Sequence, residues 1–328
     1  TLRDYYHKWY RPDLQGIIVV GDINVADVEA KIKQLFSSDT VPAGAPQRTY
    51  YDVPDNKEMI VYTQADDEQP TLNFSLYMKR DAEPRATRAT REAFLGGYKS
   101  RLAMFILRQR LAQLSHEAEP RVMSASCRDN SFYVTSEKDA FALNVGLLPD
   151  NPQAGINAAL EIVEKARRYG FTEAELEHAK VQHTVNIEHR LDNKEKTRNA
   201  EYAKNIVNNF CNAEPCMNIE YEAALEADFS ASVTLDDVNN AIKEIVNDEN
   251  QVCIVFGPTR YDGKPYTMPT AAQFKAWVEQ AQQQSYADDD KADAVDPTFM
   301  KKLPRKGKIT SKTKAANGYT EYTLSNGI

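Results

Sequence analysis

The sequence predicts an α+β fold: a two-layer repeat in which helices cover one face of an antiparallel sheet. Predicted strands open the region 57–283 and predicted helices follow them, an order typical of α+β domains. The 328 residues are 42% hydrophobic and 27% charged, which is enough apolar mass for a sizeable core. A helix–strand–helix unit also precedes this region, and it predicts the tail of a preceding repeat.

Residues 2–36 form this opening unit. Thr1 is placed to cap a first helix, which Pro12 ends. The β-branched run 16–21 has the length and composition of a buried strand and is closed by glycine. The 3.6-residue period of apolar positions predicts a second helix over 24–36. Nothing in the unit is chemically reactive.

Alternating and helical periods locate the elements of the middle region. We predict strands at 59–63, 71–78, 121–128, 131–136 and 140–147, and helices at 86–115, 153–168, 172–210 with a break near 191–193, and 219–226. Gly96 and Gly97 disfavour the first helix by about 1 kcal/mol each, and a close backbone approach by a neighbouring element is one explanation for them. Gly170 is expected to end the second helix as a left-handed cap.

The opening unit recurs near the end of this region. Thr234 begins a predicted helix to Val246, the apolar strand 251–257 again ends in glycine, and a helix through Phe274 follows. Thr1 and Thr234 are 233 residues apart. We interpret the recurrence as an internal duplication.

The remaining segments complete the predicted domain organisation. An acidic and then a basic run, both poor in large apolar residues, predict a linker. The strand-like end of the chain stops at Asn326-Gly327, a tight-turn signal, and we expect the protein to continue there. The predicted divisions are 1–51, the tail of a preceding repeat; 57–283, a complete repeat; 284–317, a linker; and 318–328, the first strand of a following repeat.

Composition excludes several classes of protein. The formal charge of −8 and pI near 5.3 argue against nucleic-acid binding, which rests on basic residues. No apolar run approaches the roughly 18–20 residues of a membrane span. Four cysteines are too few for a disulfide scaffold; Cys211 and Cys216 either bridge a small loop or remain two thiols at a helix end.

The histidines do not form a recognisable metal site. His183 and His189 are six positions apart, which places them about 240° apart around a helix. His178 and His183, five apart, are also poorly placed, and His116 lacks a partner at a suitable spacing. We therefore predict no catalytic, cofactor-binding or metal-binding residue in this chain.

Three segments resemble one protein family. TLRDYYHKWYRPDLQGIIVVGDINVADVEAKIKQLF, at 1–36, resembles the signature of helix, Y-x-P, strand and G-D-hydrophobic in the pitrilysin/insulinase family of zinc metallopeptidases. ILRQRLAQLSHEAEPRVMSAS, at 106–126, resembles that family's helix-to-strand crossing in a later repeat, and LSNG, at 324–327, resembles the entry strand of each half.

The resemblance implies a non-catalytic repeat of a zinc metallopeptidase that helps to enclose the substrate chamber. Its partners would be the upstream catalytic repeat, in the same chain or a paired subunit, and a peptide substrate. The resemblance places zinc in an upstream H-x-x-E-H helix with a distant glutamate, where metal-activated water attacks the peptide bond. Many bacterial relatives work outside the cytoplasm, which favours a periplasmic or other extracytoplasmic location.

One role in the family does not carry over. Active later repeats often supply an arginine and, seven residues on, a tyrosine that bind substrate carbonyl groups; Arg108 matches, but the second position is Ser115. The alternative interpretation is a structural or binding protein of the same fold in which every repeat is inactive. An H-x-x-E-H motif upstream of Thr1 would separate the two.

Overall fold

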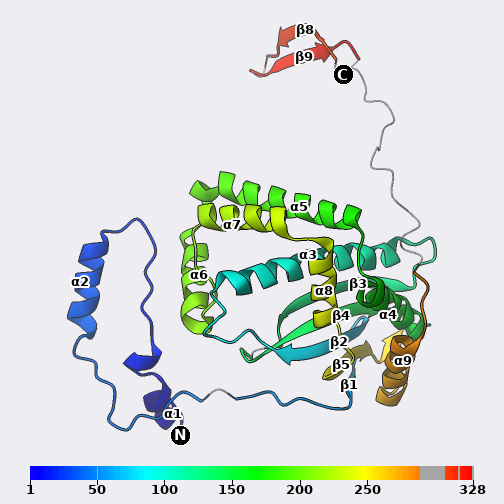
Figure 1. Ribbon diagram of the computed structural model, residues 1–328, viewed down its shortest axis with the longest axis horizontal. Coiled ribbons are helices and arrows are strands. Elements are labelled where there is room, and N and C mark those ends of the chain that lie inside the picture. The colour runs from blue at the N-terminus through cyan, green and yellow to red at the C-terminus, as the bar shows by residue number, and fades with distance from the viewer. Residues whose placement is uncertain (50, 134, 289–306, 317, 327–328) are drawn as a thin grey trace. The chain divides into compact units, whose positions relative to one another are not determined.

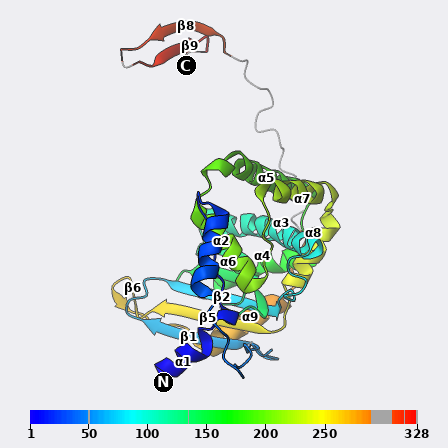
Figure 2. The same cartoon turned by 90° about the vertical axis from the view of Figure 1, so that its left-hand side faces the viewer.

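The computed structural model describes residues 1–49, 51–133, 135–288, 307–316 and 318–326. The chain divides into two units, Thr1–Asp288 and Asp289–Ile328. Figures 1 and 2 show that the larger unit contains one layer of strands with helices stacked over it.

The layer is a five-stranded sheet with the spatial order β1-β5-β2-β4-β3. Its strands are β1 (Ile60–Asp66), β2 (Leu72–Asp81), β3 (Val122–Ser131), β4 (Lys138–Leu147) and β5 (Gln251–Pro258). Three of the four pairings are antiparallel, but β1 and β5 run parallel. The expectation of a wholly antiparallel sheet was therefore wrong at this edge. The sheet is mixed because β5 returns from the far end of the repeat.

Helices cover one face of the sheet, as predicted. They are α3 (Arg91–Gln113), α4 (Pro152–Tyr169), α5 (Glu173–Asp192), α6 (Asn199–Asn212), α7 (Ile219–Ser232), α8 (Leu235–Ile245) and α9 (Ala271–Gln283). The expected break near 191–193 separates α5 from α6, and α7 extends beyond the predicted 219–226. Gly170 ends α4 with a positive φ of 79°, but its ψ of −155° lies outside the left-handed helical region.

The alternation of side chains along each strand explains this layering. On β2, Leu72, Phe74, Leu76 and Met78 all have 0% exposure and belong to the main core under the helices. The opposite face carries a small second cluster around Tyr77, which no helix covers in the described residues.

Several local predictions differ from the structure. Residues 16–21 are not in a strand; of the strand expected at 131–136, Ser131 is the last residue of β3, and residues 132–133 and 135–136 are not in a strand. A β-carbon added at Gly96 would meet no neighbouring element within 4 Å, so close approach does not explain this glycine. Part of the predicted linker, Ile309–Lys314, is strand β8, which pairs antiparallel with β9 (Thr320–Leu324). Gly327 and residues 289–306 lie outside the described residues.

The N-terminal segment contains α1 (Leu2–Trp9), a short 3-10 helix (Pro12–Leu14) and α2 (Val25–Phe36). None of these helices has a buried residue. α1 and α8 begin alike: Thr1 with Asp4, and Thr234 with Asp237, each form a complete capping box. The two helices therefore share the local N-terminal geometry on which the predicted duplication rests.

We expect Gly155→Ala to destabilise the repeat. A β-carbon at Gly155 in α4 would lie 2.9 Å from the backbone oxygen of Arg121 and 2.8 Å from Leu147 Cδ2. Overpacking costs about 1–3 kcal/mol, more than the roughly 1 kcal/mol that alanine gains in a helix. Urea unfolding should show a lower midpoint. Gly96→Ala is the control and should raise the midpoint; equal midpoints for the two variants would contradict this packing.

We also expect Asp237→Asn to weaken stability in a pH-dependent way. The Lys99 ammonium, 2.6 Å away, and the Thr234 cap lower the pKa of Asp237 to about 2. A lowered carboxyl pKa stabilises the fold above the unfolded value near 3.8, and this contribution is lost as pH falls toward 2. After discounting for solvent screening, the variant should cost about 1 kcal/mol at neutral pH.

Chemical unfolding at several pH values measures this difference. It should shrink steadily below pH 4. Asp236→Asn, in the same first turn, removes a charge near the helix dipole without touching the Lys99 ion pair, and it should cost only about 0.3 kcal/mol. A constant difference between Asp237→Asn and the unchanged protein from neutral pH down to pH 2 would refute the assignment.

Candidate functional site

The five histidines do not converge on one point. His178, His183 and His189 lie along α5, whereas His7 is in α1 and His116 is in a 3-10 helix after α3. His178 and His183 each meet the ring of Phe105 in α3 edge-on. Across the described residues, no three His, Cys, Asp or Glu side chains are grouped so that they could hold a metal ion.

A hollow between three helices brings a histidine and a glutamate together. It measures about 200 Å³ and lies where α5 and α7 meet Tyr98 of α3. His183 and Glu226 line it together with apolar residues such as Ile187. Sequence reasoning missed this cluster, because Tyr98, His183 and Glu226 come from three helices that are far apart in the sequence.

The electrostatics of the cavity favour uncharged groups. Burial, followed by the nearby Arg101 and Arg108, lowers the pKa of His183, so its imidazole is neutral near pH 7. Burial raises the pKa of Glu226, although Arg101 donates to its carboxylate at 2.8 Å and opposes that shift. His183 of α5 meets the rings of Tyr98 and Phe105 in α3, and Arg101 of α3 pairs with Glu226 of α7. These contacts join three helices.

The four cysteines lie in two different environments. Burial raises the pKa of Cys127 and of Cys253 to about 12, which keeps both thiols protonated. Cys211 and Cys216 are exposed and free, so the structure contains the unbridged alternative. Ser115, at the position where the family has tyrosine, lies in the 3-10 helix after α3 and donates its hydroxyl to the carbonyl of Ala112 at 2.9 Å.

The uncovered face of the sheet carries an aromatic patch. Tyr77 of β2 contacts the rings of Phe132 and Tyr133 with centroid distances of 5.6 and 5.4 Å. Tyr133 has a φ of 52°, an unusual conformation for a bulky residue that folds the β3–β4 turn back over the sheet. On the other side of the face, Tyr62 meets Phe256. Sequence reasoning missed this patch, because Phe132 and Tyr133 were assigned to a strand, whereas they follow the end of β3.

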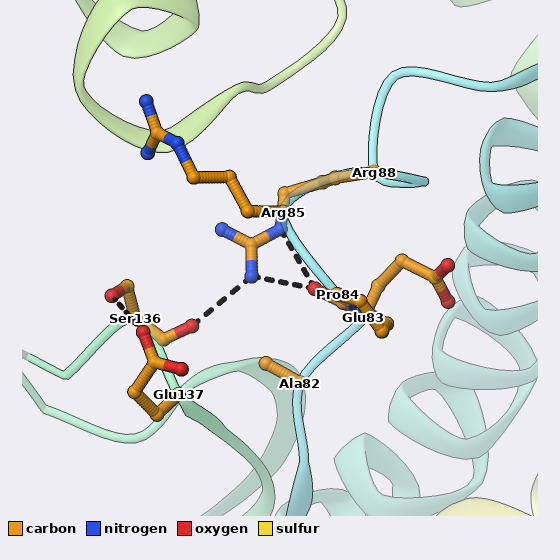
Figure 3. Close-up of a pocket in the computed structure, with 7 residues that line it drawn as sticks. All are labelled: Ala82, Glu83, Pro84, Arg85, Arg88, Ser136 and Glu137. Carbon is orange, nitrogen blue, oxygen red and sulfur yellow. Dashed lines mark hydrogen bonds between the residues drawn. The ribbon is translucent and has the colours of Figure 1, made fainter. Parts of the chain in front are cut away.

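A second hollow shows how the edge of the repeat is held together. Figure 3 shows the Arg88 guanidinium donating to the carbonyls of Glu83 and Ser136, at 2.7 and 3.0 Å for Nη2. These bonds join the segment before α3 to the β3–β4 turn. The cavity beside them, about 200 Å³, is lined mainly by the same segment. Every strong donor here is used on backbone oxygens, which indicates a structural role.

Comparisons with known proteins identify the family. The sequence profile described as "Peptidase M16 inactive domain" matches residues 1–182, more than half of the chain. The match runs through the N-terminal segment and into α5 without a break. This finding confirms the resemblance to zinc metallopeptidases and the expectation of a non-catalytic domain.

Individual relatives are longer than this chain. A probable zinc protease PqqL from Haemophilus influenzae is 21% identical over 266 residues, covering 80% of this chain and 28% of the relative. The match to the solved structure of the periplasmic protease PqqL from Escherichia coli covers 99% of this chain and 35% of the PqqL chain, with 18% sequence identity and a TM-score of 0.73. The match to the ferredoxin protease FusC, solved in complex with Arabidopsis ferredoxin, covers 99% of this chain and 36% of the FusC chain, with 18% sequence identity and a TM-score of 0.69.

At these identities the structural likeness establishes the fold alone, and the chain spans about a third of the length of such relatives. In the part of the chain that the structure describes, no helix combines the length and apolarity of a membrane crossing. The family assignment rests on the match over residues 1–182. By that match, the chain belongs to the peptidase M16 inactive domain family.

Proposed function

We propose that this chain is a non-catalytic wall of the substrate chamber in a longer zinc-dependent metallopeptidase. The match to an inactive-domain family carries the proposal. It is supported by relatives named zinc proteases that are about three times as long, and by a sheet with one uncovered, partly aromatic face. That face has the breadth and apolar character to contact an extended peptide. Hydrolysis itself belongs to a catalytic repeat upstream.

The division of the chain is part of this proposal. Residues 1–51 would complete the upstream repeat, 57–283 would form the inactive repeat, and 284–317 would lead to a third repeat that begins within 318–328. The β8–β9 hairpin shortens the proposed linker, because residues 309–314 already pair with β9. The shared capping box of α1 and α8 supports the first boundary.

Partners and location follow from the same interpretation. The catalytic repeat would be the permanent partner, in the same chain or in a paired subunit, and a peptide would be the transient one. Two structural neighbours are described as a periplasmic protease and as a protease in complex with a ferredoxin. These descriptions support an extracytoplasmic protease that receives a polypeptide, without naming its substrate.

Metal analysis and a peptidase assay test the proposal. After dialysis, the purified chain should hold far less than one zinc per molecule and should not hydrolyse unstructured peptides, because three of its five histidines are spread along α5 and the other two lie in other helices. Extending the chain upstream to include an H-x-x-E-H segment should bring both zinc and activity. One tightly held zinc per unextended chain would overturn the proposal. An active-site motif missing upstream would favour a structural protein of the same fold.

A further inference from the structure

Helix α6 exposes its apolar side. Within the described residues it is the one long helix of the repeat without a buried residue, whereas α3, α4, α5, α7, α8 and α9 each have several. Its large apolar side chains are spaced three or four positions apart and therefore share one face. They are Tyr202, Ile206, Val207 and Phe210, with exposures of 38–48%. We call these four residues the α6 stripe.

The polar side of α6 is turned toward its own repeat, because Asn208 and Asn212 are half-buried whereas the α6 stripe is exposed. Asn205 lines a hollow of about 370 Å³ together with Phe94 and Arg101 of α3 and Glu222 of α7. A helix that packs only on its own domain would place its apolar side there. The reversed orientation indicates that the α6 stripe serves a contact outside residues 57–283.

The helix is fixed in this orientation at its C-terminal end. Arg85 donates to the carbonyl of Phe210 at 2.8 Å and also to that of Cys211, and Arg88 donates to the carbonyl of Asn212 at 2.9 Å. Cations at this end also complement the helix dipole. Arg88 also donates to the carbonyl of Ser136 (Figure 3), so one guanidinium links the C-terminal end of α6 to the segment before β4.

A segment of the chain already lies along α6. The backbone at Gly16 approaches the Phe210 ring so closely that a β-carbon there would be 3.1 Å from it, and Gly21 similarly approaches Asn199 Nδ2 at 3.8 Å. Five extended residues and eleven helical residues both span about 16 Å. Residues 16–21 therefore follow the helix from its C-terminal to its N-terminal end.

Exposure alternates along this segment as it does in a strand. Ile17 and Val19 are exposed, whereas Ile18 and Val20 are partly buried, on the same side as Gly16. In β5, which the segment echoes, Cys253 and Val255 have 0% exposure under the helices. Aligned on the closing glycines, they correspond to Ile17 and Val19. The half-buried residues of the segment, Ile18 and Val20, therefore correspond to residues of β5 that lie on the face of the sheet opposite the helices.

We infer that the α6 stripe is the docking surface for the upstream repeat, whose sheet lays its uncovered face across α6 with residues 16–21 as one of its strands. This inference rests on the proposed upstream repeat and adds where that repeat is held. Neighbouring strands of that sheet would cover the rest of the stripe. The occupant is a segment of the same protein, since residues 16–21 are seated there already.

Limited trypsin digestion of the full-length protein tests the contact. Cleavage after Arg48 or Lys57, between α2 and β1, reports how firmly the repeats are held. Ile206→Asp places a charge in the apolar contact and should accelerate this cleavage about tenfold or more. Val185→Asp is the control, because Val185 is a β-branched residue on α5 with 52% exposure. It should leave the rate unchanged.

Three outcomes would overturn the inference. The first is digestion of Ile206→Asp at the original rate. The second is an equal acceleration of cleavage by Val185→Asp. The third is a loss of dimerisation without faster cleavage, which would assign the α6 stripe to a second copy of the chain. None of these readouts involves zinc or peptide hydrolysis, so the proposed function can stand if the docking surface fails.

A cross-link covers the case in which Ile206→Asp does not fold. In a Cys211→Ser, Cys216→Ser background, Gly16→Cys with Phe210→Cys should be joined rapidly by a short bismaleimide, because these positions are in contact. Gly16→Cys with Val185→Cys is the matched control pair and should not be joined. Absence of the first cross-link, or equal yields for both pairs, would contradict the docking surface.

Discussion

The sheet depends on one long-range insertion. β5, from the end of the repeat, lies between β1 and β2 from its beginning, parallel to the first and antiparallel to the second. Ile60 pairs with Val252 across most of the repeat. Closing so long a loop costs conformational entropy. Burial of Cys253 and Val255 under the helices, together with the pairing of β5 on both of its sides, offsets this cost. Without this strand, β1 would have no partner in the main sheet.

The same constraint accounts for the most informative difference between sequence and structure. Residues 16–21 have the composition of β5 but are not a strand, because the described residues include no strand on either side of them. Local signals predicted what is locally determined: the capping boxes, the break after α5 and the helices over the sheet. The parallel direction of β1 and β5 and the pairing of residues 309–314 depend on distant partners, and composition alone does not specify those.

The features near the candidate site also divide into those that local sequence determines and those that depend on residues far apart in the chain. The absence of a plausible histidine spacing could be read directly, and the described residues group no metal ligands. The Arg101–Glu226 contact joins residues 125 positions apart and had no local signal. The sequence analysis did not identify the α6 stripe, because only the structure shows that these apolar side chains turn away from their own repeat. The chain thus combines a repeat that has its own hydrophobic core with an exposed apolar surface, the α6 stripe, for which we infer a partner domain.

Amide hydrogen exchange over residues 17–20 tests the central claim, that the opening segment completes an upstream repeat and the present chain is scaffold. In the 328-residue chain these amides should exchange quickly, because no strand pairs with them among the described residues. In a longer protein that includes the upstream repeat, they should be protected about a thousandfold or more, as expected for a central strand. Equal, rapid exchange in both proteins would contradict the account.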